Sequence, residues 1–314
     1  MIEVKNLVKR YGTFTAVNDV SFSIDKGRIY GFLGPNGAGK STTMNIITGY
    51  LAATEGQVTI NGYDILKEPE KAKQSVGYLP EMPPIYLDCT VREYLKFVAE
   101  LKRIPAGRQE TQCMAVMNKL GLESVADKLI GSLSKGYKQR VGLAQAIMGF
   151  PDTIILDEPM VGLDPQQIIE MRELIRSLAK NHTVILSSHI LAEVREICDY
   201  IMIISRGRLV AQDTPENLEK LMGDDSTIHL EAPGTLERIQ YVISHVDNID
   251  SADYVKKNDS LYEVLIQPAG SHEIREELFN AFARYEVPLY TLYKESPSLE
   301  DIYLKLIQEG VNLK

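Results

Sequence analysis

Apolar and polar residues alternate along three segments near the amino terminus. These segments are Ile2 to Leu7, Val20 to Ile24 and Gln57 to Ile60, and a period of two predicts strands that bury one face. Asn61 and Gly62 follow the third segment, and this pair favours the left-handed turn of a two-residue hairpin. The chain is therefore expected to begin with a β-rich layer.

A glycine-rich segment interrupts this layer. The run from Arg28 to Gly34 leads into it as a strand, and Ser41 to Gly49 follows it as a helix that ends on a glycine. The segment itself, Gly34 to Thr42, fits the pattern G-x-x-x-x-G-K-[ST]. The expected order is strand, glycine loop, helix.

Helical periodicity then extends from Thr90 to Gly149. Thr90 and Glu93 have the spacing of a capping box, in which each side chain satisfies an exposed backbone amide at the start of a helix. Apolar residues at helical spacing follow as far as Leu101. This part of the chain is predicted to be almost entirely helical.

The α/β pattern returns after the helical part. Thr153 to Leu156 and Thr183 to Ser187 are short, nearly all-apolar runs, which are typical of parallel strands covered on both faces. Pro165 to Lys180 has the pattern of the helix between them. A hairpin from Tyr200 to Ile204 and from Arg208 to Ala211, followed by a short helix, is expected to end this domain.

Length and pattern together indicate two domains. At 314 residues the chain exceeds the roughly 100 to 200 residues of a usual domain. We expect a first domain over residues 1–222 and a second over residues 223–314, with Gly223 to Ser226 as the linker. The second domain has strand and helix patterns in a β-α-β-β-α-β-like order, with an amphipathic helix from Ser298. It is predicted to be a small α+β domain without a catalytic constellation.

Composition narrows the class of protein. Hydrophobic residues make up 44% and charged residues 25%, as in a well-folded globular protein. The net charge of -9 gives no general attraction to nucleic acid or anionic lipid, so a bound anion requires a local site. Cys89, Cys113 and Cys198 lack metal or disulfide spacing, and we expect them to be reduced thiols. No apolar run reaches the length of a membrane helix, and the amino terminus lacks the features of a signal peptide.

The segment Gly34 to Thr42 predicts a phosphate-binding loop. Its glycines let backbone amides point inward, and the positive end of the following helix attracts phosphate. Lys40 is expected to reach the β- and γ-phosphates, and the Ser41 hydroxyl to ligate Mg²⁺. The expected nucleotide-binding residues of the loop are Gly34, Pro35, Asn36, Gly37, Ala38, Gly39, Lys40, Ser41 and Thr42. The flanking strand and helix disfavour an incidental glycine turn, but the loop alone does not separate a GTPase, a kinase, a motor and a transporter ATPase.

Four further segments carry candidate chemistry. Leu133 to Tyr137 is a short loop at a helix start, and Asp157 and Glu158 are adjacent acids at the end of an apolar strand. Gly162 to Asp164 follows these acids, and His189 follows the next strand. In isolation the first loop would be a simple helix cap and the acid pair a solvated loop. Their order after a phosphate loop decides against those interpretations.

In order and spacing, these segments resemble the motifs of ABC ATPase domains over about residues 1–220. The resemblance implies the α/β fold of a P-loop NTPase, with a β-rich N-terminal layer, a parallel-sheet core and a helical signature subdomain. The small α+β C-terminal domain would follow it. The resemblance also implies a Mg²⁺-dependent ATPase, with ATP and Mg²⁺ as cofactors.

The resemblance assigns part of the nucleotide site to a second subunit. Tyr11 would stack on adenine. Ser134 and Gly136 would donate hydrogen bonds to the γ-phosphate of an ATP held by the phosphate loop of the opposing subunit. Asp164 belongs to the loop that links the two sites across the dimer. Hydrolysis would then require a dimer.

Catalytic roles are also implied by the resemblance. Asp157 would hold Mg²⁺, as would Ser41. Glu158 would polarise the attacking water as general base, and His189 would contact the γ-phosphate. Together with Lys40, these residues form the expected catalytic group.

Three residues depart from the usual family pattern. Lys135 replaces the first glycine, and Tyr137 the glutamine, of Leu-Ser-Gly-Gly-Gln, while Ser134 and Gly136 are kept. Glu81 stands where the family most often has glutamine, on the hinge to the helical subdomain. A carboxylate can also ligate Mg²⁺, so Glu81 is kept as a metal-binding candidate.

Other segments resemble one branch of exporter ATPases, which serves drug, polysaccharide and gliding-motility systems. They are Tyr78 to Glu81, Leu133 to Ala146 and Ser298 to Tyr303. In that branch two ATPase subunits pair with separate membrane permease chains, and closure of the ATP-bound dimer reshapes the permease. We therefore expect a homodimer in the cytoplasm, held peripherally at the inner face of the cell membrane by its permease, with no nucleic acid partner.

Two competing functions belong to the same family. A soluble ABC ATPase of translation or DNA repair usually carries two ATPase domains, a coiled-coil insertion or a basic face, and none is visible in the sequence. A catalytically inactive regulatory subunit would be expected to lack Lys40, Glu158 or His189, and all three are present. The sequence identifies neither the cargo nor the role of residues 223–314.

Overall fold

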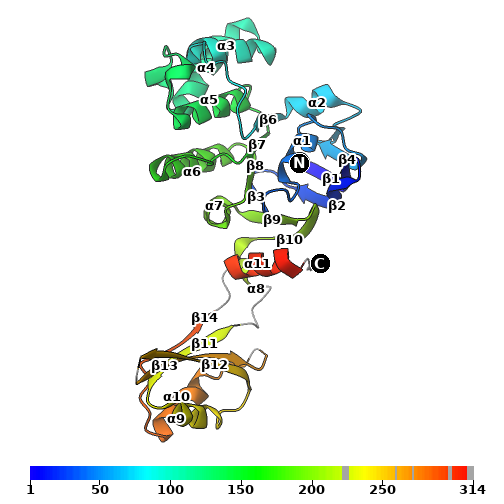
Figure 1. Cartoon of the computed structure of the whole chain (residues 1–314). Helices are drawn as coiled ribbons and strands as arrows, with labels where there is room; N and C mark the ends of the chain where they lie inside the picture. Colours follow the sequence, from blue (N-terminus) through cyan, green and yellow to red (C-terminus); the bar gives the residue numbers. More distant parts are fainter. Residues whose placement is uncertain (221–225, 259, 271, 296–298, 310–314) are drawn as a thin grey trace. The chain divides into compact units, whose positions relative to one another are not determined.

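The chain folds into two compact units. The computed structural model describes residues 1–220, 226–258, 260–270, 272–295 and 299–309. The first unit is formed mainly by Met1–Pro215 and the second by Glu216–Gln308, and the elements of both are labelled in Figure 1. The domain boundary expected after residue 222 lies outside the described residues.

An antiparallel sheet forms the β-rich layer at the amino terminus, with its strands in the order β2-β1-β4-β5. The strands are β1 (Ile2–Tyr11), β2 (Phe14–Ile24), β4 (Glu55–Ile60) and β5 (Tyr63–Asp64). Asn61 and Gly62 adopt left-handed backbone conformations, with φ of 51° and 85°, which confirms the predicted hairpin. Strands β1 and β2 are longer than predicted, because their pairing continues beyond the regular alternation.

The second sheet is the α/β core. Its order is β10-β9-β3-β8-β7-β6, and it is parallel except for the antiparallel pair of β9 with β10. The strands are β3 (Ile29–Leu33), β6 (Val76–Leu79), β7 (Thr153–Asp157), β8 (Thr183–Ser188), β9 (Tyr200–Ser205) and β10 (Arg208–Asp213). Every residue of β3, β7 and β8 is buried, which explains their nearly all-apolar composition. The predicted parallel-sheet core is confirmed.

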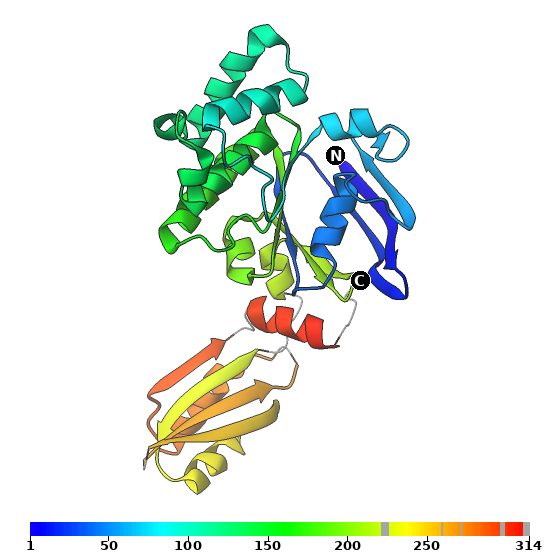
Figure 2. The same ribbon diagram turned by 45° about the horizontal axis from the view of Figure 1, so that its top comes forward.

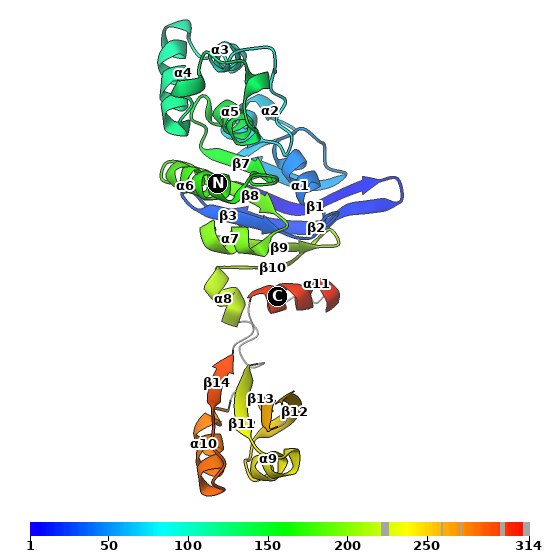
Figure 3. The same cartoon turned by 60° about the vertical axis from the view of Figure 1, so that its left-hand side comes forward.

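Helices cover both faces of this core sheet. α1 (Lys40–Ile47) lies between the two sheets, and its buried apolar side chains join one hydrophobic cluster with side chains of both. α6 (Pro165–Ala179) and α7 (Leu191–Ile197) pack on the opposite side, against β8 and β3 (Figure 3). The short helix α2 (Pro69–Gln74) precedes β6. The carboxyl ends of the core strands are thereby fixed between layers.

A helical subdomain lies beside β6 (Figure 1). It contains α3 (Val91–Leu101), α4 (Ala106–Leu120), α5 (Lys135–Ile147) and the 3-10 turns Glu123–Val125 and Ile130–Ser132. The predicted capping box of α3 is present: Thr90 Oγ1 accepts from the Glu93 amide at 3.2 Å, and Glu93 Oε2 accepts from the Thr90 amide at 2.9 Å. In the described part of the chain, none of the helices combines the length and apolar character needed to cross a bilayer.

The second unit has its own sheet and core. Antiparallel strands lie in the order β12-β13-β11-β14. The elements are α8 (Pro215–Lys220), β11 (Thr227–Pro233), α9 (Leu236–Ile243), β12 (Ile249–Asn258), β13 (Leu261–Pro268), α10 (Arg275–Arg284), β14 (Thr291–Glu295) and α11 (Leu299–Glu309). Helices α9 and α10 cover one face of the sheet (Figure 2) and share a hydrophobic cluster with it. The predicted α+β class and element order are confirmed, although the sequence did not specify the limits of β12.

Candidate functional site

The segment Gly34 to Thr42 connects the carboxyl end of β3 to the start of α1. Gly39 has a φ of 106°, and a Cβ at this position would lie 2.5 Å from the Ala16 carbonyl oxygen. Only glycine satisfies both the left-handed backbone and this close approach. The loop therefore has a fixed backbone conformation against the β-rich layer, and it leads directly into the amino end of α1.

Lys40 is buried in this loop, with 6% of its surface exposed. Its ammonium donates to the carbonyl oxygens of Gly34 at 2.7 Å and Pro35 at 3.3 Å. The Glu158 carboxylate lies 3.4 Å away. A buried ammonium is tolerated only when it is paired and hydrogen-bonded. The contacts fix the Lys40 side chain across the mouth of the loop.

Two buried carboxylates stand at the carboxyl end of β7. Asp157 Oδ1 accepts from the Ser41 hydroxyl at 3.3 Å and also from the Ser187 hydroxyl of β8. The Glu158 amide donates to Ser187 Oγ at 3.1 Å. Glu158 has a φ of 50°, a left-handed conformation that costs a non-glycine residue roughly 1 to 3 kcal/mol. The surrounding hydrogen bonds hold this carboxylate in a strained but defined position.

His189 completes the cluster from the loop after β8. Its Nδ1 lies 2.9 Å from Glu158 Oε2, and because a carboxylate only accepts, the ring N–H donates. The other carboxylate oxygen, Oε1, faces Lys40. The His189 side chain is 38% exposed, whereas that of Glu158 is 8% exposed. Glu158 therefore has one oxygen against each neighbour.

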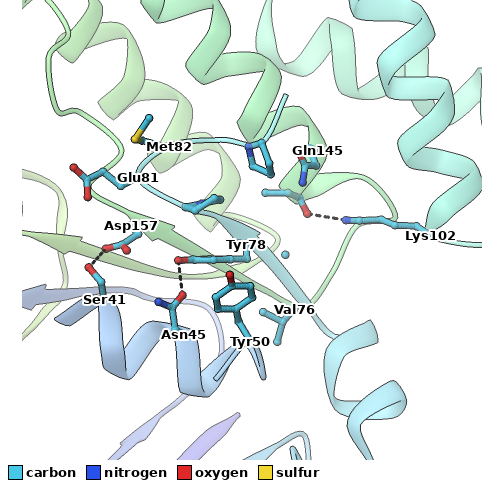
Figure 4. A pocket seen from close by; sticks show the side chains of 14 residues that line it. Ser41, Asn45, Tyr50, Val76, Tyr78, Glu81, Met82, Lys102, Gln145 and Asp157 are labelled. Atoms are coloured by element: carbon cyan, nitrogen blue, oxygen red, sulfur yellow. Dashed lines mark hydrogen bonds between the residues drawn. The ribbon is translucent and has the colours of Figure 1, made fainter. Parts of the chain in front are cut away.

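A cavity of about 740 Å³ opens beside Asp157. Figure 4 shows Ser41, Asp157 and Glu81 on its wall. Glu81 is exposed on the loop after β6. Hydroxyl and carboxylate oxygens are the donors that Mg²⁺ prefers, and Ser41 and Asp157 already lie within hydrogen-bonding distance of each other. The residues present thus fit a Mg²⁺ ion.

Two hydrogen bonds order other walls of the same cavity. The Tyr78 hydroxyl donates to Asn45 Oδ1 at 3.1 Å, and Lys102 donates to the Ala146 carbonyl oxygen at 3.1 Å (Figure 4). Burial, together with the nearby charge of Asp157, raises the pKa of the Tyr78 phenol. Tyr78 is therefore a neutral donor at physiological pH. These bonds connect β6 to α1, and α3 to α5.

The predicted signature loop lies at the start of α5. Ser134 is the N-cap, and its hydroxyl accepts from the Tyr137 amide at 3.4 Å. Gly136 packs against α6, where a Cβ would lie 2.8 Å from Gln167 Cδ. Asp164 caps α6 by accepting from the Gln167 amide at 2.9 Å. Ser134 is thus a helix cap in the single chain, and this role says nothing about a contact with a second chain.

Four of the expected site residues lie apart from this cluster. In the described part of the chain, no hydrogen bond or ion pair joins Ser134, Gly136 or Asp164 to the loop Gly34 to Thr42. Tyr11 is at the end of β1, 49% exposed, with the Lys9 ammonium 5.3 Å from its ring centre. The structure therefore brings together the loop, both acids and His189, but not the signature residues.

Comparison with known proteins identifies the family. A family model described as ABC transporter matches residues 17–161. The linearmycin resistance ATP-binding protein LnrL of Bacillus subtilis is 34% identical over 310 residues, which cover 98% of each chain. This chain belongs to the ABC transporter family. The bacitracin transport ATP-binding protein BcrA of Bacillus licheniformis is another member, 34% identical over 313 residues that cover 99% of this chain and 98% of BcrA.

The solved structures agree with the ABC transporter assignment. One, described as the ATP-binding subunit of an ABC transporter, matches with a TM-score of 0.65 and 32% identity, over 71% of this chain and 93% of that one. The predicted α/β fold of an ABC ATPase is confirmed. This ABC transporter subunit binds ATP and hydrolyses it. A soluble ABC ATPase outside transport is not favoured.

Sequence reasoning missed one residue at the centre of this ABC site. Ser187 joins Asp157 to the Glu158 backbone, although the sequence indicated only a buried strand there. The available signal was a polar pair, Ser187 and Ser188, at the carboxyl end of an otherwise apolar strand. In a parallel sheet that end faces the same edge as Asp157, where ligands bind.

Proposed function

We propose that this ABC ATPase subunit powers an exporter through separate membrane-spanning chains. The observation that carries the proposal is similarity along almost the whole chain, second unit included, to a linearmycin resistance protein and a bacitracin transport protein. Sequence similarity that extends beyond the ATPase unit favours a shared type of partner. In this account the subunit lies in the cytoplasm, at the inner face of the membrane, where its permease holds it.

The phosphate loop would hold the ATP triphosphate. Its curved backbone and the amino end of α1 attract negative charge, and Lys40 would exchange its loop carbonyls for the β- and γ-phosphates. Ser41 and Asp157 would hold Mg²⁺, with Glu81 near the same cavity wall. When bound, Mg²⁺ supplies positive charge that offsets the charge developing on the phosphates.

Glu158 would act as the general base. Its carboxylate lies beside Lys40, the proposed phosphate-binding lysine. The same carboxylate is hydrogen-bonded to His189, whose side chain is partly exposed. A carboxylate there can orient water and accept its proton. His189 would hold Glu158 through Nδ1 while its exposed ring edge meets the γ-phosphate. The strained backbone of Glu158 is consistent with a catalytic position.

A second copy of the chain would complete each ATP site. Among the described residues, no hydrogen bond joins Ser134 or Gly136 to the phosphate loop of the same chain, yet they present a helix start and a hydroxyl suited to phosphate. In a two-fold dimer each chain would supply this surface to the ATP of the other. Asp164 would lie between the two sites, and Tyr11 would stack on adenine.

Copurification tests the proposed export function. The tagged full-length chain, expressed from its native locus, is extracted with mild detergent from membranes and its partners are identified. We expect a stoichiometric chain with about six membrane helices, and loss of resistance to linearmycin or bacitracin when Glu158→Gln replaces the wild type. Recovery of the chain only in cytosolic complexes without a membrane protein would contradict the proposal.

A further inference from the structure

Glu193 is a buried acid outside the proposed catalytic group. It lies on α7, and 5% of its surface is exposed. Buried glutamates are rare unless a specific partner holds them. The partner here is Ser188, the last residue of β8, whose hydroxyl donates to Glu193 Oε2 at 2.7 Å.

Ser188 makes a second hydrogen bond through the same oxygen. Its Oγ accepts from the Ile190 amide at 3.0 Å. A hydroxyl has one proton, so donation to Glu193 leaves a lone pair for the amide. Ser188 and Ile190 flank His189, and the two bonds therefore fix the backbone turn on both sides of the histidine.

This turn sets the position of the His189 ring. His189 Nδ1 lies 2.9 Å from Glu158 Oε2, while Ser187, one residue before Ser188, binds the Glu158 amide. Ser187 and His189 thus contact Glu158, and Ser188 between them contacts Glu193. A shift of this turn would move the histidine relative to the carboxylate, and catalysis is sensitive to misplacement on the scale of 1 Å.

The surroundings of Glu193 do not provide it with a stabilising ion pair. Burial raises the pKa of its carboxyl, the Ser188 hydrogen bond opposes this, and the negative charge of Glu158 adds to the rise. Arg172 and His189 act in the opposite direction on this pKa, but Arg172 pairs with Glu196. A buried acid beside another acid is unfavourable for folding, which points to a role other than stability.

We propose that Glu193 is a positioning residue for ATP hydrolysis, which fixes through Ser188 the turn that holds His189 against Glu158. The inference rests on the proposed roles of Glu158 and His189. Glu193 touches neither substrate nor metal in this role. It acts only through the hydrogen bond to Ser188.

Steady-state ATPase kinetics of the purified chain test this role. Glu193→Met removes the acceptor and keeps the volume, and Ser188→Ala removes the donor. Each is expected to lower kcat about tenfold with KM for ATP unchanged, because the phosphate loop is intact. Glu193→Gln keeps an acceptor oxygen and should retain kcat within about twofold. Glu173→Met, at an exposed position of α6, is the matched control.

The combined variants separate this role from a purely structural one. Ser188→Ala with Glu193→Met should lose no more kcat than either alone, since both remove one bond. Unchanged kcat in Glu193→Met, or equal loss in the Gln and Met variants, would overturn the inference. Glu158→Gln and His189→Ala are assayed in parallel: if these keep full turnover, the proposed catalytic roles fail instead.

Discussion

At the scale of single residues, the site depends on side chains that constrain one another. Glu158 is held through its amide by Ser187 and through its two oxygens by Lys40 and His189. Asp157 is held by the hydroxyls of Ser41 and Ser187. Such mutual contacts keep charged groups buried at tolerable cost. They also fix the positions of the groups to which we assign ATP hydrolysis.

Glu193 predicts a specific dependence of stability on pH. Its folded-state pKa is raised above the ordinary value of 4.5, so the unfolded chain releases this proton at lower pH than the folded chain. The stability that the protonated form provides is complete below pH 4.5 and is lost as pH rises through the folded pKa. Glu193→Gln, which cannot ionise, should match the wild type near pH 4 and exceed it increasingly at higher pH.

Thermal unfolding monitored by circular dichroism between pH 4 and 8 measures this difference. Glu173→Gln, at an exposed position of α6, is the control and should show no such rise. A Glu193→Gln advantage that is constant across the range, or largest at the acid end, would contradict the burial of an ionising carboxyl.

Sequence could indicate some of these residues and not others. Asp157 and Glu158 follow an apolar strand directly, and Lys40 lies within a loop pattern of fixed spacing. The local sequence is therefore enough to identify them as site residues. The roles of Ser187 and Glu193 depend on which strand lies beside β7 and how α7 packs. Serine and glutamate at a strand end and on a helix are common, and only the folded arrangement distinguishes them.

At the scale of elements, the sequence predicts helices and strands correctly where the hydrophobic pattern and the capping residues agree. Strands β3, β7 and β8 are apolar because both faces are covered. Helices α3, α5 and α6 begin at side chains that cap them, Thr90, Ser134 and Asp164. The predicted limits of these elements are correct to within a few residues for that reason.

The capping box of α3 gives a prediction at this scale. Thr90→Ala removes the bond from Thr90 Oγ1 to the Glu93 amide and should destabilise the chain by about 1 kcal/mol. KM for ATP should not change, because Thr90 lies in the helical subdomain. Denaturant unfolding and ATPase assays measure both quantities. Thr90→Ser, which can restore the cap, should recover stability; failure to recover it would contradict the assignment of the loss to the cap.

Elements of the second unit were harder to delimit. Strand β12 is mostly exposed, on the edge of its sheet, so apolar alternation does not mark it clearly. The strand-like pattern before β14 extends back to Pro288, but the strand begins at Thr291. Proline fits poorly within a hydrogen-bonded strand, and the observed limit agrees with that rule.

At the scale of the whole molecule, the two parts of the predicted ATP site are separated within one chain. The loop, the acids and His189 form one cluster, while Ser134 and Gly136 lie at the start of α5 against α6. The spacing of the motifs alone does not state which copy completes which site, and only the family resemblance assigns Ser134 and Gly136 to the opposing subunit. We therefore propose that ATP is hydrolysed between two chains.

Mixing two inactive variants tests that claim most directly. Lys40→Ala disables the phosphate loop and keeps the signature surface. Ser134→Asp keeps a helix cap but sets a carboxylate against phosphate, and its phosphate loop is intact. In a mixed dimer one site would combine the intact loop of one chain with the intact signature of the other.

ATPase activity of the mixture, after subunit exchange, is the decisive measurement. We predict that it exceeds the activity of either variant alone and approaches about a quarter of the wild-type rate, because half of the dimers are mixed and each has one intact site. Wild type mixed with the double variant Lys40→Ala, Ser134→Asp should instead fall after exchange from about half to about a quarter of the wild-type rate, because neither site of a mixed dimer is intact and only wild-type dimers stay active. A mixture of the single variants that stays as inactive as its components, despite confirmed exchange, would contradict hydrolysis between two chains.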